Sequence, residues 1–179
     1  MRYIALLRGI NVGGNTKVPM PELKQVFSEL GFENVSTYIN SGNLAFDVGG
    51  KTSGNTEKKL ISQIEQAIEQ HFDLPIQVMV RQQESIEEVL KCNPFAGEFE
   101  SHKEMHVLFM KVEMPADKQT QLLERQTADE RFAVLGREIY CHLRLGVADS
   151  LLGKGFIEKK LKVPITARNW RTVGRLADL

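Results

Sequence analysis

The sequence predicts an α+β protein made of two duplicated ferredoxin-like halves that pack together. Short apolar runs alternate with amphipathic stretches in the order β-α-β-β-α-β across the first half of the chain. The same order returns in the second half, where Val163–Thr166 echoes Leu74–Gln77. We therefore expect one half at residues 1–92 and the other at residues 93–179, with a C-terminal helix in the second.

In the first half, each element has a local signature. Residues 2–8 form a short apolar run stopped by Gly9, which predicts a buried strand. Pro19 and Pro21 suit the start of a helix, and Gly31 suits the position just after its end.

A hairpin and a second helix complete the first half. Alternating residues in 34–39 and 44–48 predict two strands, and residues 40–43 carry turn chemistry. Apolar residues along one face of 60–72 predict a long helix, and alternation over 76–80 predicts a further strand.

The region between the halves contains a short helix and a connector. Ser85 to Glu88 is a capping box, which predicts that a helix begins there. Asn93 and Pro94 end this helix, and residues 93–103 are expected to be a connector.

The second half repeats the pattern of the first. Residues 105–112 predict a strand, Pro115 a helix start, and 132–135 with 138–143 a hairpin. Ser150 is a candidate cap for a helix that extends to residue 161. After it come an expected apolar strand segment at residues 163–166 and a stretch at residues 168–176 that echoes residues 81–89.

Length and composition suit a soluble globular protein of 179 residues. Lys and Arg number 23, as do Asp and Glu, which excludes a nucleic-acid coat over the whole surface but not a local basic patch. The N-terminal apolar run is too short for a signal peptide, and no stretch reaches the length of a membrane span. Cys92 and Cys141 form no CxxC motif, which predicts reduced thiols and a cytoplasmic location.

Three motifs carry a family resemblance: LLRGINVGG at 6–14, TYINSGNLAF at 37–46 and TARNWRTVGRLADL at 166–179. Together they resemble the bacterial family DUF1697, which is catalogued as a domain of unknown function. The resemblance implies a duplicated α+β fold in a soluble bacterial protein. It implies no activity, substrate or catalytic residue.

This chain departs from the pattern of that family in its second half. A Ser-Lys pair is usual in the family where Ser150 and Leu151 stand here, and a proline is usual near Arg144. A role for that lysine is therefore not implied for this chain, unless Lys154 takes it over.

The opening motif is the leading candidate for a ligand site. Arg8 stands at a strand end, where a guanidinium can bind a phosphate or carboxylate, or else tie the loop to the sheet. We weigh these two roles equally. Gly9, Gly13 and Gly14 permit positive φ angles or close approach of a ligand, whereas Asn11 suits a turn cap better than a ligand contact.

Other candidates lie in the hairpin turn and near the C-terminus. Ser41 and Asn43 are counted as candidate ligand contacts, although turn duty is the stronger interpretation of Ser41. Arg168 and Asn169 form a second candidate group, which we expect to share a site with Arg8.

No cofactor or metal site is expected. The glycine-rich loop fits neither GxGxxG nor GxxxxGK[ST]. His102 and His106 precede a strand and lack the glutamate of HExxH, so they are not expected to form a zinc site. His71 and His142 have no obvious acidic or thiol partner in the sequence.

The leading functional hypothesis is the binding of an anionic small molecule or nucleotide-like ligand near residues 9–14. The first alternative is nucleic-acid binding through the basic segment at 154–179, with Trp170 stacking on a base, although an anchoring role for Trp170 is favoured. A cofactor-free enzyme acting on a phosphorylated metabolite and a structural or oligomerising module also stay open. No membrane partner is expected, and the oligomeric state is not defined by the sequence.

Overall fold

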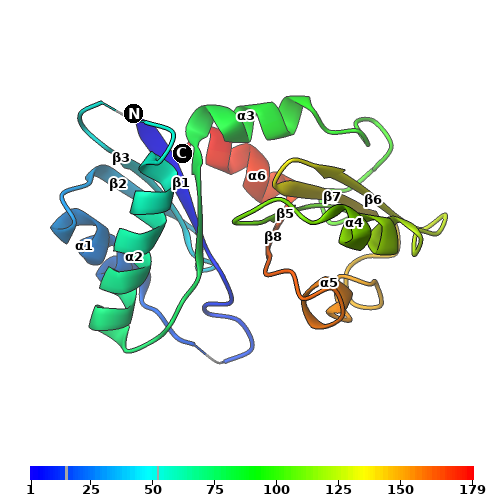
Figure 1. Cartoon of the computed structure of the whole chain (residues 1–179), viewed down its shortest axis with the longest axis horizontal. Coiled ribbons are helices and arrows are strands. Elements are labelled where there is room, and N and C mark those ends of the chain that lie inside the picture. Colours follow the sequence, from blue (N-terminus) through cyan, green and yellow to red (C-terminus); the bar gives the residue numbers. More distant parts are fainter. Residues whose placement is uncertain (15, 52) are drawn as a thin grey trace. The chain divides into compact units, whose positions relative to one another are not determined.

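The computed structural model describes residues 1–14, 16–51 and 53–179 (Figure 1). The chain divides into two compact units. The first unit is Met1–Glu87 with Arg175–Leu179, and the second is Glu88–Gly174. The boundaries between the units fall inside two helices, α3 (Gln83–Lys91) and α6 (Trp170–Ala177).

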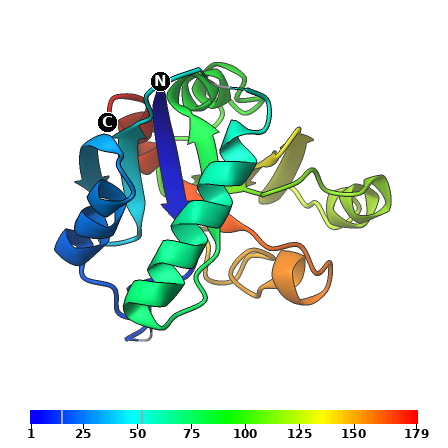
Figure 2. The same cartoon turned by 60° about the vertical axis from the view of Figure 1, so that its left-hand side comes forward.

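The first unit contains a four-stranded antiparallel sheet and two helices (Figure 2). In chain order its elements before α3 are β1 (Arg2–Leu7), α1 (Met20–Glu29), β2 (Glu33–Tyr38), β3 (Asn43–Asp47), α2 (Thr56–Phe72) and β4 (Val78–Gln82). The strand order is β2-β3-β1-β4, so β1 pairs with both β3 and β4. The loop between β1 and α1 therefore begins at the end of a central strand.

The core of the first unit lies between the sheet and its two helices. Phe27 of α1 and Ile64 of α2 pack with Tyr3 and Leu7 of β1 in one cluster of buried residues. Phe27 also meets Phe46 edge to face, with ring centroids 5.3 Å apart, an arrangement favoured by the ring quadrupoles. The helix stripes predicted from apolar spacing are therefore the buried faces.

Proline and glycine mark the ends of α1 as the sequence predicts. Pro19 is the N-cap, with φ −63° and ψ 124°, and Pro21 lies in the first turn. Gly31 has φ +81°, and its amide donates to the carbonyl of Ser28 over 3.0 Å. A positive φ just past the helix closes the last turn at little steric cost for glycine.

The second unit has the same order of elements. They are β5 (Met105–Phe109), α4 (Ala116–Leu123), β6 (Glu130–Leu135), β7 (Glu138–Leu143), α5 (Phe156–Lys159) and β8 (Thr166–Asn169). The strand order is β6-β7-β5-β8, and all neighbours are antiparallel. Its core includes Leu108, Leu122, Cys141, Ile157 and Ile165. The chain is thus an α+β protein with two four-stranded antiparallel sheets in two similar halves.

Two predicted helix starts are wrong. The helix α3 begins at Gln83, directly after β4, so Ser85 and Glu88 lie inside it instead of capping it. The helix predicted from Ser150 is reduced to the four residues of α5. Ser150 instead organises a turn, because its Oγ accepts from the amide of Gly153 over 3.1 Å and donates to the carbonyl of Val147 over 2.6 Å.

Two strand predictions are also corrected. Of the strand segment expected at residues 163–166, only the last residue is in a strand, because β8 begins at Thr166. Pro164 has no N–H to donate to a strand ladder. Arg168 consequently lies within β8 rather than after it. The strand predicted at 105–112 ends at Phe109, and Met110 adds one further backbone bond by donating to the carbonyl of Arg137.

Across residues 1–14, 16–51 and 53–179, no helix combines the length and the apolar character that a membrane crossing requires.

Candidate functional site

The three glycines of the segment 9–14, which follows β1, adopt left-handed backbone conformations. Gly9, Gly13 and Gly14 have φ of +67°, +62° and +78°, and all three residues are exposed. The expectation that Gly13 or Gly14 adopts a conformation unfavourable for other residues is therefore confirmed.

Asn11 fastens this loop to its surroundings. Its Nδ2 donates to the carbonyls of Val18, over 2.9 Å, and Asn40, over 2.8 Å. Its Oδ1 accepts from the amide of Val18 over 2.9 Å. Asn11 itself has φ +53°, a conformation that asparagine tolerates better than most residues. These bonds give Asn11 the capping role that its sequence context favoured.

A cavity of about 360 Å³ opens beside the fastened loop in the first unit. Its lining residues are Asn11, Gly14, Lys17, Val18, Pro19, Met20 and Asn40. Lys17 is exposed and supplies the positive charge of this lining. Of the predicted ligand contacts, Asn11 and Gly14 line the cavity. Arg8 is partly buried and is not among the lining residues.

The hairpin turn at residues 39–42 packs tightly under the same loop. Gly42 has φ +81°, and a Cβ on it would lie 2.7 Å from Cβ of Leu7. Asn43 is buried, and its Nδ2 donates to the carbonyl of Tyr38 and to Oγ of Ser41, each over 2.9 Å. Ser41 and Asn43 thus contact each other within the turn, and their predicted ligand roles stay predictions.

Arg168 and Asn169 lie in the second unit and have structural contacts of their own. Arg168 is buried in β8, where Nη1 donates to Oγ1 of Thr166 over 2.8 Å and to the carbonyl of Ala167 over 2.9 Å. Burial lowers the pKa of Arg168 to about 10. Asn169 Oδ1 accepts from the amide of Thr172 over 2.9 Å, which caps the start of α6. A site shared by Arg8 and Arg168 stays a prediction.

Trp170 is partly buried and meets Phe99 edge to face, with centroids 5.9 Å apart. This contact is of the anchoring kind that the sequence analysis favoured over base stacking.

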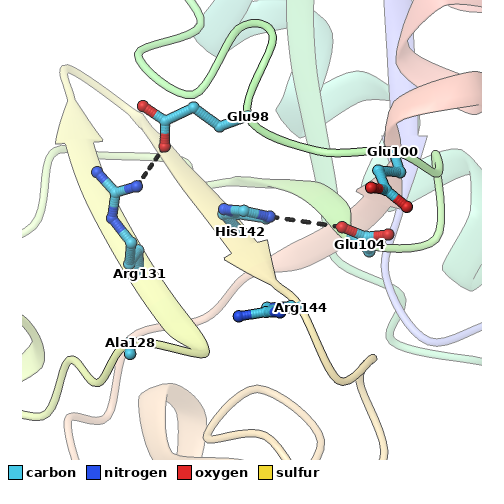
Figure 3. A pocket seen from close by; sticks show the side chains of 7 residues that line it. All are labelled: Glu98, Glu100, Glu104, Ala128, Arg131, His142 and Arg144. Atoms are coloured by element: carbon cyan, nitrogen blue, oxygen red, sulfur yellow. Dashed lines mark hydrogen bonds and ion pairs between the residues drawn. The ribbon is translucent and has the colours of Figure 1, made fainter.

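The second unit contains a larger cavity, of about 530 Å³, that the sequence analysis did not foresee (Figure 3). It is lined by Glu98, Glu100, Glu104, Ala128, Arg131, His142 and Arg144. His142 Nε2 points toward Glu104, whose Oε2 lies 3.6 Å away. That distance is too long for a hydrogen bond, and the contact is an ion pair only when the imidazole is protonated.

The charged side chains of this cavity differ in how firmly they are held. Arg131 pairs with Glu98, and its guanidinium lies 4.9 Å from the ring centroid of Phe95. Arg144 is largely exposed and only loosely paired, with Nη1 3.7 Å from Oδ1 of Asp129. The cavity is therefore lined by one close ion pair and by one exposed, loosely paired guanidinium.

Comparison with protein families identifies the chain. The model of the family described as "Protein of unknown function (DUF1697)" matches residues 1–140. The protein belongs to this family. No curated protein matches the chain. Among solved structures, it is similar to a conserved bacterial protein from Streptococcus pneumoniae. That protein is 28% identical, with a TM-score of 0.74, over 99% of this chain and 97% of the other.

In this DUF1697 member, the residues that line the larger cavity lie outside the three family motifs.

The sequence did not predict that Glu104 and His142 lie close together, because they are far apart along the chain. They come together because β5 pairs with β7, with Met105 opposite His142. Glu104 directly precedes this pair, and its carbonyl accepts from the amide of Leu143 over 2.7 Å. The sequence did predict the hairpin that contains His142. It could not predict that β5 pairs with this hairpin, because local pattern does not set which strands become neighbours.

In the described ranges, no three His, Cys, Asp or Glu side chains are grouped as a metal ion would require.

Proposed function

We propose that the protein binds an anionic small molecule, or the anionic part of a nucleotide-like ligand, beside its glycine-rich loop. The observation that carries this proposal is the 360 Å³ cavity, in which Gly14 and Lys17 stand on the same lining. A lysine ammonium next to exposed loop backbone is a combination suited to phosphate or carboxylate.

The loop supports this proposal because it is held in shape before any ligand arrives. Asn11 bonds to the carbonyls of Val18 and Asn40, two residues that also line the cavity. A site that is already ordered loses less conformational entropy on binding. Met20 and Pro19 add an apolar wall that suits a sugar or a base.

A thermal-shift titration tests the proposal with inorganic phosphate and AMP as probes. Ligand that binds only the folded chain should raise the melting temperature as its concentration increases. Lys17→Gln should abolish the shift, whereas Lys24→Gln, an exposed lysine on α1, should retain it. An equal shift in both variants, or no shift with either probe, would contradict the proposal.

Arg8→Ala separates the two roles of Arg8. A ligand role predicts little change in melting and a smaller shift with phosphate. A structural role predicts clearly lower melting, since its partner groups lose a donor at a cost of about 1–3 kcal/mol.

We also infer that the halves arose by duplication of a ferredoxin-like unit. Their identical strand order supports this, and so do two buried arginines in matching places. Arg81 in β4 donates to the carbonyl of Val80, and Arg168 in β8 donates to that of Ala167, each over 2.9 Å. Each arginine is followed by one strand residue and then a helix.

A cytoplasmic location is part of the same proposal. Cys92 and Cys141 are both free, and burial raises the pKa of the Cys141 thiol above its usual range. Unpaired thiols of this kind are typical of a reducing compartment.

A further inference from the structure

The cavity of the second unit divides its charges between two walls (Figure 3). Arg131 and His142 are register partners on β6 and β7, so their side chains share one face of the sheet. Arg144 lies two residues beyond His142 and continues on that face, because its amide still donates to the carbonyl of Asp129. The sheet wall is therefore basic.

The opposite wall is acidic. Glu98, Glu100 and Glu104 all come from the connector between α3 and β5. Among the residues that the structure describes, Glu100 has no ion-pair partner, and the Glu104 carboxylate has only its long contact with His142. Two carboxylates thus face the cavity without a firm cation of their own.

His142 is the buried polar group of this cavity. It is only 9% exposed, and its Nε2 has no hydrogen-bond partner. Phe95 and Phe99 lie beside the ring, with centroids 5.9 and 6.4 Å away. A buried ring nitrogen without a hydrogen bond is unfavourable, so burial of this group between aromatic rings and a carboxylate is not explained by packing alone.

The balance of charge selects the kind of ligand. The lining carries three carboxylates and two guanidiniums, which leaves no excess of positive charge for a phosphate. A free cation would meet Arg144, and a free anion would meet Glu100. A molecule with both charges matches both walls, and the volume of about 530 Å³ lies in the range of small-molecule sites.

We propose that this cavity binds a small zwitterion of the α-amino-acid class. The ligand ammonium group contacts Glu100 and Glu104, and the ligand carboxylate contacts Arg144. His142 holds the Glu104 carboxylate toward the ligand as a positioning residue. This site is separate from the glycine-rich loop and does not depend on the function proposed there.

The test uses the full chain, with the common free L-amino acids as probes. Binding is measured by isothermal titration calorimetry and by the NMR signals of the His142 ring and the Arg144 side chain. At least one amino acid should bind and shift both sets of signals. Acetate and methylammonium, which each carry one of the two charges, should bind at least roughly tenfold more weakly.

Matched variants locate the site. Arg144→Gln and Glu100→Gln change exposed side chains, so folding should be retained, and each should weaken binding roughly tenfold or more. Arg125→Gln and Glu113→Gln, exposed residues of the same unit outside the cavity, should bind like the wild type. Lys17→Gln should also bind the amino acid normally, which separates this result from the test of the loop site.

Three results would overturn the proposal. One is that no amino acid shifts the signals of His142 or Arg144. Another is that acetate or phosphate binds in this cavity as tightly as any zwitterion. The third is that Arg144→Gln and Glu100→Gln bind the amino acid as the control variants do.

Discussion

Among single residues, His106 connects stability to pH. It lies in β5 with its Nδ1 buried and lacking a hydrogen-bond partner. Burial, and to a lesser extent the nearby His102, lowers the pKa of His106 below its ordinary 6.5. The unfolded chain then binds this proton more readily than the folded chain, so the contribution of His106 to stability is complete above 6.5 and falls as the pH drops toward the folded-state pKa.

Urea unfolding at about pH 7.5 and about pH 5 measures this effect. His106→Gln should lose less unfolding free energy between these two values than the wild type loses. Asp47 affects stability only at a lower pH. The hydrogen bond from Asn34, and to a lesser extent Arg2, lowers the pKa of its carboxyl below 3.8. A variant with the same pH dependence as the wild type would show that His106 is not the group responsible.

Arg168 is the residue for which a binding role and a structural role conflict most directly. Its buried guanidinium donates to Thr166 and Ala167 within its own strand. Arg168→Met should therefore lower the unfolding free energy by about 1–3 kcal/mol, because the buried hydroxyl of Thr166 and the part-buried carbonyl of Ala167 lose their donor. Arg171→Met, at an exposed position close by, should change it by less than about 0.5 kcal/mol. Equal, small effects of both changes would instead favour a ligand role for Arg168.

Among elements, the hairpin turn after β2 depends on glycine for two separable reasons. Gly42 needs a positive φ, and a Cβ there would lie 2.7 Å from Cβ of Leu7 and 2.8 Å from Cδ1 of Ile10. Gly50 has a similar φ of +86° but open space around it. Gly50→Ala therefore measures backbone strain alone, while Gly42→Ala measures strain and overpacking together.

Thermal or urea unfolding measures the loss of stability in each variant. The difference between the two losses is the cost of overpacking at Gly42. Gly50→Ala should cost roughly 1 kcal/mol, and Gly42→Ala should cost about 1–3 kcal/mol more. If the two variants were equally stable, the close packing between the turn and the loop after β1 would not hold in solution.

At the scale of the whole molecule, the two thiols report on opening of the fold. Cys92 is exposed, whereas Cys141 is fully buried in the core of the second unit. With a thiol reagent such as Ellman's, Cys92 should react at once, because thiol reactivity requires access and thiolate. Cys141 should react only as fast as the second unit unfolds.

The variant Cys92→Ser isolates the slow reaction, and its rate should rise with urea in parallel with unfolding followed by circular dichroism. Rapid labelling of Cys141 in native buffer would mean that the second unit opens far more easily than its packed core indicates.

By itself, the sequence determined the elements of this protein and the α+β class. Apolar periodicity, proline and glycine act over a few residues, so the spacing in α2 or the Gly31 position predicts structure locally. Local signals also misled, as at Ser85 and Ser150, where a helix that follows a strand directly or a tight turn overrode the capping pattern.

Only the tertiary structure decided which side chains meet. Asn11 reaches Asn40 and Glu104 reaches His142 because particular strands became neighbours. Strand pairing is a nonlocal choice made by burial of whole faces, and it carries no signature at either residue. The burial of Arg168 and the polar cavity of the second unit follow from the same physical cause, so neither was visible in the order of the residues.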